Sequence, residues 1–196
     1  MLSHVQSKLL YSRLLQMTME TNQPVPDFEL PDLEGRFHYL NDYRGKIVII
    51  NFWSCECPHS ERTDKAIMAM FVQHLHRAAD AVQVWRNDVV MLSIAANRSE
   101  NVEALKIAAD VRRLPTVLID AQCFVADLFE AQTTPHVYVI DRKGILRYRG
   151  AVDDVTFRKR TPSRFFLDEA VESLLEGRLP TLTESPGYGC AIVREI

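Results

Sequence analysis

Apolar and polar residues alternate along this chain in segments of two kinds. The first kind is a short run rich in β-branched apolar residues, which is typical of a strand buried on both faces of a sheet. Four such runs lie at residues 46–53, 89–96, 115–120 and 136–141. The second kind has apolar residues about four positions apart, as expected for one face of an α-helix. Two helices are predicted in this way, one through Ile67, Phe71 and Leu75 and one after Ser99 through Val102, Leu105 and Ala109.

The remaining pattern predicts a hairpin and a last helix. Lys143-Gly144 is a turn between the run at 136–141 and another short strand, which makes an antiparallel hairpin. Thr161-Pro162 is expected to open the last helix, and Gly177 to close it with a left-handed cap. The order of strands, helices and hairpin predicts an α/β sandwich with a central mixed β-sheet flanked by helices.

The chain is long enough for one domain with extensions. Its 196 residues slightly exceed the typical size of a single domain. We expect a helical N-terminal extension at 1–22, the folded domain at 23–179 and a C-terminal tail at 180–196. The tail is rich in Pro, Gly, Ser and Thr, which predicts an irregular structure.

Charge and targeting signals narrow the setting in which the protein works. The net charge of −3 provides no long-range attraction to nucleic acid or to an anionic membrane. Lys8, Ser12 and Arg13 interrupt the apolar start of the chain, so that no signal peptide is predicted, and no run has the length of a membrane span. We therefore expect a cytoplasmic protein, without a nucleic-acid or membrane partner, whose four cysteines are mostly reduced.

One cysteine lies where a thiol becomes reactive. In the segment "NFWSCECPHSE", Cys57 follows the first predicted strand and directly precedes Pro58, which begins a helix. Unpaired amides and the dipole at a helix N-terminus favour an anion, and such sites lower a cysteine pKa from ~8.5 to between ~3.5 and ~7.5. The thiolate is the form that attacks disulfides and peroxides. The alternative is that Cys57 is a small buried apolar residue at a strand end.

Three segments resemble a known family. They are "PDFELPDLEGRFHYLNDYRGKIVIINFWSCECPHSE", "TTPHVYVIDRKGILRYRG" and the ending "YGCAI". Together they are similar to the thioredoxin-like redoxins, the alkyl-hydroperoxide-reductase/thiol-specific-antioxidant group and its membrane-anchored thiol-disulfide reductase relatives, over residues 26–196. The resemblance implies a thioredoxin-like sandwich. It assigns Cys57 as the attacking nucleophile, Pro135 as a cis-proline that faces it, and Thr134 as the residue whose backbone holds a substrate strand.

Two positions depart from the family pattern. Asn51 replaces the buried acid that the family has at the end of its first central strand. Ser60 occupies the position of the resolving cysteine. Because a hydroxyl cannot form a disulfide, Cys57 is expected to stall as a sulfenic acid or mixed disulfide until another thiol arrives.

Three hypotheses for the function remain open. The leading one is an intracellular thiol-disulfide oxidoreductase that uses Cys57, a thiol or disulfide substrate and an external thiol reductant, with no cofactor or metal. The second is a thiol peroxidase that reduces hydroperoxides. The third is a non-enzymatic copper(I) carrier, in which Cys55, Cys57, His59 and His136 converge as ligands.

The thiol that resolves an oxidised Cys57 has three candidates. A disulfide requires Cα atoms within roughly 7 Å of each other. Cys55 is close in sequence but would form a small strained ring, and Cys123 is expected to be buried in a packed helix. Cys190 follows two glycines in the tail, which is predicted to be flexible enough to approach. The other interpretation of Cys190 is a terminal thiol packed against the domain. The sequence does not indicate an oligomeric state.

Overall fold

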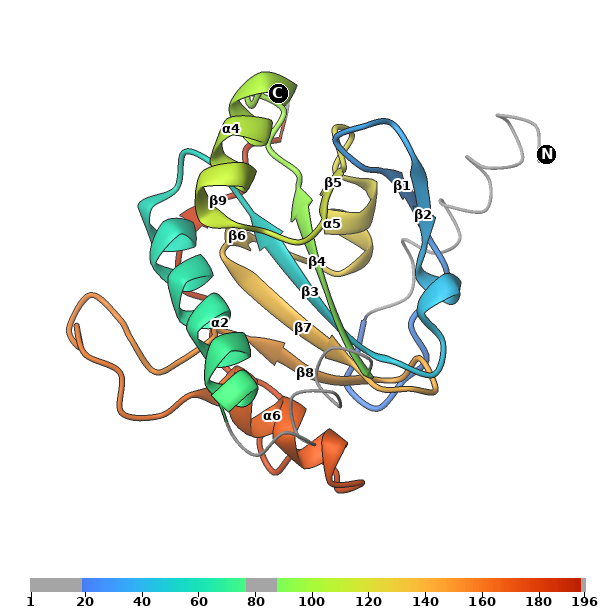
Figure 1. Cartoon of the computed structure of the whole chain (residues 1–196), viewed down its shortest axis with the longest axis vertical. Helices are drawn as coiled ribbons and strands as arrows, with labels where there is room; N and C mark the ends of the chain where they lie inside the picture. Colours follow the sequence, from blue (N-terminus) through green and yellow to red (C-terminus); the bar gives the residue numbers. More distant parts are fainter. Residues whose placement is uncertain (1–18, 77–87, 195–196) are drawn as a thin grey trace.

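A mixed five-stranded sheet is the centre of the fold, as the sequence predicts. The computed structural model describes residues 19–76 and 88–194. The strand order is β5-β4-β3-β7-β8, with β3, β4 and β5 parallel and β7 and β8 antiparallel to their neighbours (Figure 1). The strands are β3 (Ile47–Trp53), β4 (Val89–Ala95), β5 (Val117–Ile119), β7 (His136–Ile140) and β8 (Leu146–Gly150). Every residue of β3 is buried, because this strand lies in the middle of the sheet with both faces covered.

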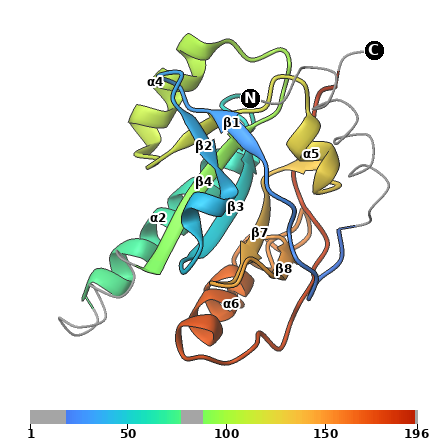
Figure 2. The same cartoon turned by 90° about the vertical axis from the view of Figure 1, so that its right-hand side faces the viewer.

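Helices cover both faces of the sheet. They are α2 (Pro58–His76), α4 (Val102–Arg112), α5 (Phe124–Leu128) and α6 (Phe166–Leu175). Apolar residues of α2 and α6 pack with Ile47 and Ile49 on one face, whereas residues of α5 pack with Val48 and Ile50 on the other. This division follows from the alternation of side chains along a strand. Figure 2 shows α2 and α5 on opposite sides of the sheet.

The predicted helix after Ser99 is α4, and its two ends have local causes. Asn101 is the N-cap, and its side chain accepts a hydrogen bond from the backbone N–H of Ala104 at 2.8 Å. Arg113 closes the helix in a left-handed conformation. The N-terminal part of the domain adds the hairpin of β1 (Glu29–Pro31) and β2 (Phe37–Tyr39), followed by the short 3₁₀ helix η1 (Leu40–Tyr43).

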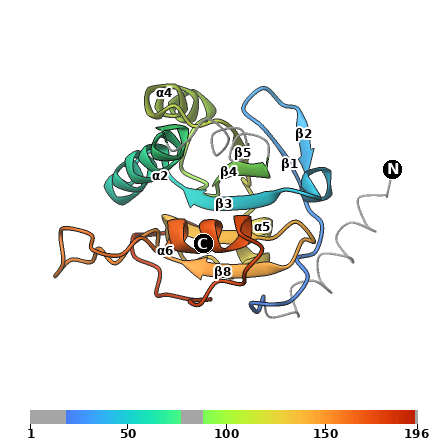
Figure 3. The same ribbon diagram turned by 60° about the horizontal axis from the view of Figure 1, so that its bottom comes forward.

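The last helix begins later than predicted. Helix α6 starts at Phe166, so Thr161 and Pro162 do not open it. The carboxylate of Asp154 holds the preceding segment as a loop, because it accepts hydrogen bonds from the backbone N–H and the hydroxyl of Ser163 at 2.9 Å each. Figure 3 shows this segment in orange, projecting from the body of the fold. The predicted cap at Gly177 is confirmed by its positive φ of 74°.

The tail is more ordered than its composition predicts. Two strands, β6 (Thr133–Thr134) and β9 (Cys190–Ala191), pair antiparallel and join the tail to the loop before β7 (Figure 1). The next residue, Ile192, is buried in the main apolar core and donates its backbone N–H to the carbonyl of Gln132. The prediction of an irregular tail is therefore wrong at these residues.

The predicted N-terminal helix lies almost entirely outside the described residues. Met19 and Glu20, at the end of that prediction, are not helical. The domain boundaries at residues 22 and 179 stay predictions. Within residues 19–76 and 88–194, no helix is long and apolar enough to cross a membrane.

Candidate functional site

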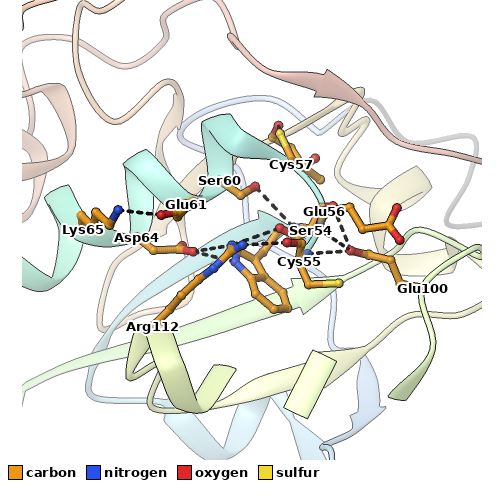
Figure 4. A network of polar contacts seen from close by, with 12 residues as sticks. Ser54, Cys55, Glu56, Cys57, Ser60, Glu61, Asp64, Lys65, Glu100 and Arg112 are labelled. Atoms are coloured by element: carbon orange, nitrogen blue, oxygen red, sulfur yellow. Dashed lines mark hydrogen bonds and ion pairs between the residues drawn. The ribbon is translucent and has the colours of Figure 1, made fainter. Parts of the chain in front are cut away.

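Cys57 lies at the start of α2, where the sequence predicts it. The chain leaves β3 at Trp53, and the loop Ser54 to Cys57 leads into the helix. The thiol is buried, with only 3% of the residue exposed. Its Sγ lies 3.0 Å from the carbonyl oxygen of Thr134 and 2.7 Å from the Sγ of Cys190. Figure 4 shows that the side chains of Cys55 and Cys57 leave the loop in different directions.

The surroundings of Cys57 favour its thiolate. Burial alone would raise the pKa of this thiol. Hydrogen bonds from the thiol of Cys190 and from the backbone N–H groups of Ser60, Cys190 and His59 outweigh burial, so that the pKa is lowered. Burial, together with the hydrogen bond to Cys57 and its charge, raises the pKa of Cys190 to about 11. The pair therefore keeps its proton on Cys190 when Cys57 is ionised.

The loop that faces Cys57 contains a cis peptide bond between Thr134 and Pro135. Thr134 belongs to β6, and its carbonyl oxygen accepts a hydrogen bond from the thiol of Cys57. The backbone that the family resemblance assigns to a substrate strand pairs here with the tail, since Thr134 lies opposite Cys190 in the antiparallel ladder. The structure thus brings together Cys57, Thr134 and Cys190. Pro135 is the next residue in the chain after Thr134 and carries the cis peptide bond.

Two glycines allow the tail to lie this close. A Cβ atom on Gly189 would lie 2.1 Å from the carbonyl oxygen of Thr134, and one on Gly187 would lie 3.0 Å from the hydroxyl of Thr133. Between them, the ring of Tyr188 contacts the ring of His59, with centroids 4.8 Å apart. His59, which the copper hypothesis uses as a ligand, therefore packs against the tail.

Ser60 is the third residue of α2 and is fully buried. Its hydroxyl accepts a hydrogen bond from the backbone N–H of Ser54 at 3.3 Å. The side chain thus helps to hold the loop before Cys57 against the helix. In β3, Asn51 is also fully buried, and neither polar atom of its amide has a hydrogen-bond partner among the described residues.

Glu100 holds this loop from the other side, and the sequence analysis missed it. One of its carboxylate oxygens accepts hydrogen bonds from the hydroxyl of Ser54 at 2.9 Å and from the backbone N–H of Cys55 at 2.6 Å (Figure 4). Glu100 lies in the loop after β4, the parallel neighbour of β3. The carboxyl ends of neighbouring parallel strands lie at the same edge of the sheet, so the loop after β4 lies beside the loop after β3. A polar residue in the loop after the second predicted strand, such as Glu100, could therefore have been expected near Cys57.

A buried ion pair completes the support of the loop. Arg112, at the end of α4, donates to the carbonyl oxygen of Cys55 at 2.6 Å and pairs with Asp64 at 3.1 Å. Asp64 also accepts a hydrogen bond from the indole N–H of Trp53 at 2.7 Å. Trp53 is thereby fixed in the core below the loop. Arg112 is far in sequence from Trp53 and Asp64, and only the fold brings it to them.

The ligands of the copper hypothesis do not form a metal site. In the part of the chain that the structure describes, no group of three or more His, Cys, Asp or Glu side chains is placed to hold a metal ion. Burial and the carboxylate of Glu100 raise the pKa of Cys55 to about 12. Burial lowers the pKa of His136 to about 4, and its ring stacks on Tyr138. The expected convergence of these residues is therefore wrong.

Cys123 is a packed residue rather than part of the site. It is buried at the start of α5, and its thiol donates to the carbonyl oxygen of Ala96 at 3.0 Å. Burial raises the pKa of this thiol. The predicted burial of Cys123 is confirmed, although the residue is the N-cap of α5 (Phe124–Leu128) and does not lie within the helix.

The central sheet, its flanking helices and the cysteine at the N-terminus of α2 define a thioredoxin-like protein. Residues 21–149 match the AhpC/TSA family, and the chain belongs to this family. The family resemblance seen in the sequence is thereby confirmed.

Individual relatives agree with this assignment. The chain is 31% identical over 119 residues to the thiol-disulfide oxidoreductase ResA of Geobacillus thermodenitrificans, which covers 61% of this chain and 62% of that protein. It therefore spans less than two thirds of the length of this relative. A solved structure of an uncharacterized conserved protein from Geobacillus kaustophilus has a TM-score of 0.72 at 26% identity and covers 91% of this chain and 94% of its own. A hypothetical protein from Sinorhizobium meliloti has the same TM-score at 22% identity, over 91% of this chain and 97% of its own, which shows the fold alone.

Proposed function

We propose that this protein is a thiol-disulfide oxidoreductase and that Cys57 is its attacking thiolate. The observation that carries the proposal is the position of the Cys57 sulfur, at a helix N-terminus and against the backbone of Thr134. The lowered pKa of Cys57 supports it, because the attacking species is the thiolate. The similarity to a thiol-disulfide oxidoreductase of Geobacillus thermodenitrificans supports it too.

The reaction is a thiol-disulfide exchange. The Cys57 thiolate attacks one sulfur of a substrate disulfide, and the bond between the two substrate sulfurs breaks. The departing sulfur leaves as a thiolate and takes a proton, while the first sulfur remains bound to Cys57 as a mixed disulfide. The N–H groups of His59 and Ser60 at the start of α2 stabilise the negative charge before the attack and whenever Cys57 leaves again. Ser60 cannot release the substrate, because it has no thiol.

The substrate class follows from the strand edge beside the thiol. Thr133 and Thr134 form a short edge that already binds one extended segment, the tail, through antiparallel backbone pairing. An extended peptide with a disulfide fits the same edge, since β-pairing binds backbone without regard to side chains. The proposed substrates are therefore disulfides or thiols of proteins and peptides, with an external thiol as reductant. A cytoplasmic location stays a prediction, which cell fractionation tests.

Peroxide reduction has less support. The approach to Cys57 lacks the Pro-x-x-x-Thr-x-x-Cys pattern of typical peroxiredoxins. Besides backbone N–H groups, its sulfur contacts the backbone carbonyl of Thr134 and the thiol of Cys190. The backbone carbonyl and the second thiol favour a disulfide substrate that binds as an extended strand over a hydroperoxide.

The test is the trapping of Cys57 by a disulfide. The reduced protein is mixed with an excess of a disulfide-containing peptide, quenched with acid, and the adduct is located by mass spectrometry. We expect the adduct on Cys57 in Cys190→Ser and in the double variant Cys55→Ser/Cys190→Ser, because the thiol that lies against Cys57 is then removed, and its loss when Cys57→Ser is added. An adduct that forms equally fast on the other cysteines would overturn the proposal. Sulfenate formation on Cys57 by hydrogen peroxide that outpaces disulfide capture would instead support the peroxidase hypothesis.

A further inference from the structure

The tail places a second thiol on the nucleophile. Cys57 and Cys190 are 133 residues apart in sequence, yet their sulfurs lie 2.7 Å apart. Cys190 reaches this place because it pairs with Thr134, whose carbonyl oxygen also contacts Cys57. A disulfide bond is ~2.05 Å long, so the two sulfurs already lie close to bonding distance.

Contacts on both sides of Cys190 hold the tail in this position. Before it, Gly189 lies against the backbone of Thr134 where no Cβ atom fits. After it, Ile192 is buried in the core. Further along, Arg194 pairs with Asp127 at 2.9 Å. Together with the ring contact between Tyr188 and His59, these contacts hold the short segment around Cys190 in place.

We propose that Cys190 is the resolving thiol of this protein and that Cys57 and Cys190 form its redox-active disulfide. The inference rests on the proposed function, in which Cys57 first forms a mixed disulfide with a substrate. Cys190 then supplies the second thiol that Ser60 cannot provide. Among the described residues, Cys190 is the cysteine whose sulfur contacts that of Cys57.

The resolving step balances in atoms and electrons. Cys190 loses its proton, and its thiolate attacks the Cys57 sulfur of the mixed disulfide. The bond between Cys57 and the substrate sulfur breaks, and the substrate leaves as a thiolate that takes up the proton. Overall, two protein thiols are oxidised to one disulfide, and one substrate disulfide is reduced to two thiols. An external dithiol reduces the Cys57–Cys190 disulfide and returns the protein to its starting state.

Strand β9, which contains Cys190, also controls access to the nucleophile Cys57. β9 occupies the edge of Thr133 and Thr134 that an incoming peptide would use, and Cys57 is buried beneath it. The tail therefore has to leave this edge before a substrate strand binds, and it displaces the substrate on its return. Gly187 and Gly189 lie within the three residues before Cys190 and provide the backbone freedom for this movement.

A stoichiometric disulfide reagent tests the proposal. Cys55→Ser and Cys123→Ser are combined to leave only the proposed pair, and the reduced protein receives one equivalent of 5,5′-dithiobis(2-nitrobenzoate). With Cys190 present, the first chromophore leaves when Cys57 is modified and the second when Cys190 attacks, so that two are released per protein. With Cys190→Ser added, we expect one chromophore and an adduct on Cys57 that survives more than about tenfold longer, because an intramolecular thiol acts at high effective concentration.

The outcomes separate this inference from the proposed function. A persistent adduct on Cys57 despite an intact Cys190 would overturn the inference and leave Cys57 as the nucleophile. Absence of any adduct on Cys57 in the variant with Cys190→Ser would overturn both. If the combined variant does not fold, the wild-type protein is oxidised and its linked peptides are mapped without reduction. A Cys57–Cys190 link supports the inference, and a link from Cys57 to Cys55 or Cys123 contradicts it.

Two glycine variants test the role of the strand itself. Gly189→Ala places a methyl group 2.1 Å from the Thr134 carbonyl oxygen, whereas Gly187→Ala comes no closer than 3.0 Å to a side-chain hydroxyl. We expect Gly189→Ala to slow the second chromophore release more than Gly187→Ala does, without slowing the first. Equal rates of second release in both variants and the wild-type protein would show that the pairing of β9 with β6 does not position Cys190.

Discussion

Asp64 is a buried carboxyl group whose ionisation should make the stability of this protein depend on pH. It is fully buried below the loop that carries Cys57, and it bonds to Trp53 and Arg112. Burial raises the pKa of Asp64 from 3.8 to about 6, although the two hydrogen bonds lower it. The folded state therefore binds a proton more tightly than the unfolded state does.

The sign and size of the effect follow from this difference. A group with a raised folded pKa contributes stability that is fully present below its unfolded pKa and is lost as the pH rises through its folded pKa. For Asp64 the loss falls between about pH 4 and pH 7, and the full difference in pKa corresponds to about 3 kcal/mol. Asp64→Asn keeps an acceptor for Trp53 and Arg112 but removes the titration. The free energy of unfolding of the variant should therefore rise relative to the wild-type value as the pH increases.

The assay is urea unfolding of the reduced wild-type protein and of Asp64→Asn at a series of pH values from about 2.5 to 7.5, so that the range also covers the pH below the unfolded pKa of 3.8 of the control residue Asp141. Asp141→Asn is the control of opposite sign, because hydrogen bonds from Ile145 and Arg147 outweigh burial and lower the pKa of Asp141. Its contribution is lost as the pH falls, so the wild-type advantage over this variant should shrink at low pH. A wild-type minus Asp64→Asn difference that stays constant over this range would refute the reasoning about Asp64.

Three further predictions concern the loop and its thiols. Cys190→Ala should raise the pKa of Cys57 by removing a hydrogen-bond donor, so the midpoint of iodoacetamide alkylation against pH should move upward; an unchanged midpoint would show that Cys190 does not stabilise the thiolate. Glu100→Ala should lower the free energy of unfolding by about 1–3 kcal/mol, since the N–H of Cys55 loses its acceptor, and urea unfolding measures this. Ser60→Cys, added to Cys190→Ala, should restore the second chromophore release, because residue 60 lies one helical turn beyond Cys57. Continued accumulation of the adduct would contradict that geometry.

Much of the central fold follows from local patterns in the sequence. The run at 46–53 predicts β3, and the structure has this strand at Ile47–Trp53 with every residue buried. Strand and helix periodicities are properties of neighbouring residues, so they are visible without the fold. The same holds for the position of Cys57, because a strand followed by a short loop and Pro58 places it at a helix N-terminus wherever the rest of the chain lies.

Contacts between distant segments were decided by the tertiary structure alone. Glu100, Arg112 and Asp64 carry no shared local pattern. Glu100 and Arg112 both bond to Cys55, and Arg112 pairs with Asp64, because the loop after β4 and the end of α4 lie beside the start of α2. The late start of α6 depends on the side chain of Asp154, which competes with the helix for Ser163.

The tail shows most clearly the difference between what the local sequence determines and what the tertiary structure determines. Its composition predicts an irregular segment, and its cysteine alone does not say whether it packs or reacts. Backbone pairing is nearly independent of side-chain identity, so the strand formed by Cys190 and Ala191 depends on an available edge rather than on its own residues. The edge at Thr133 and Thr134 exists only once the sheet has assembled, and it is this edge that places Cys190 on Cys57.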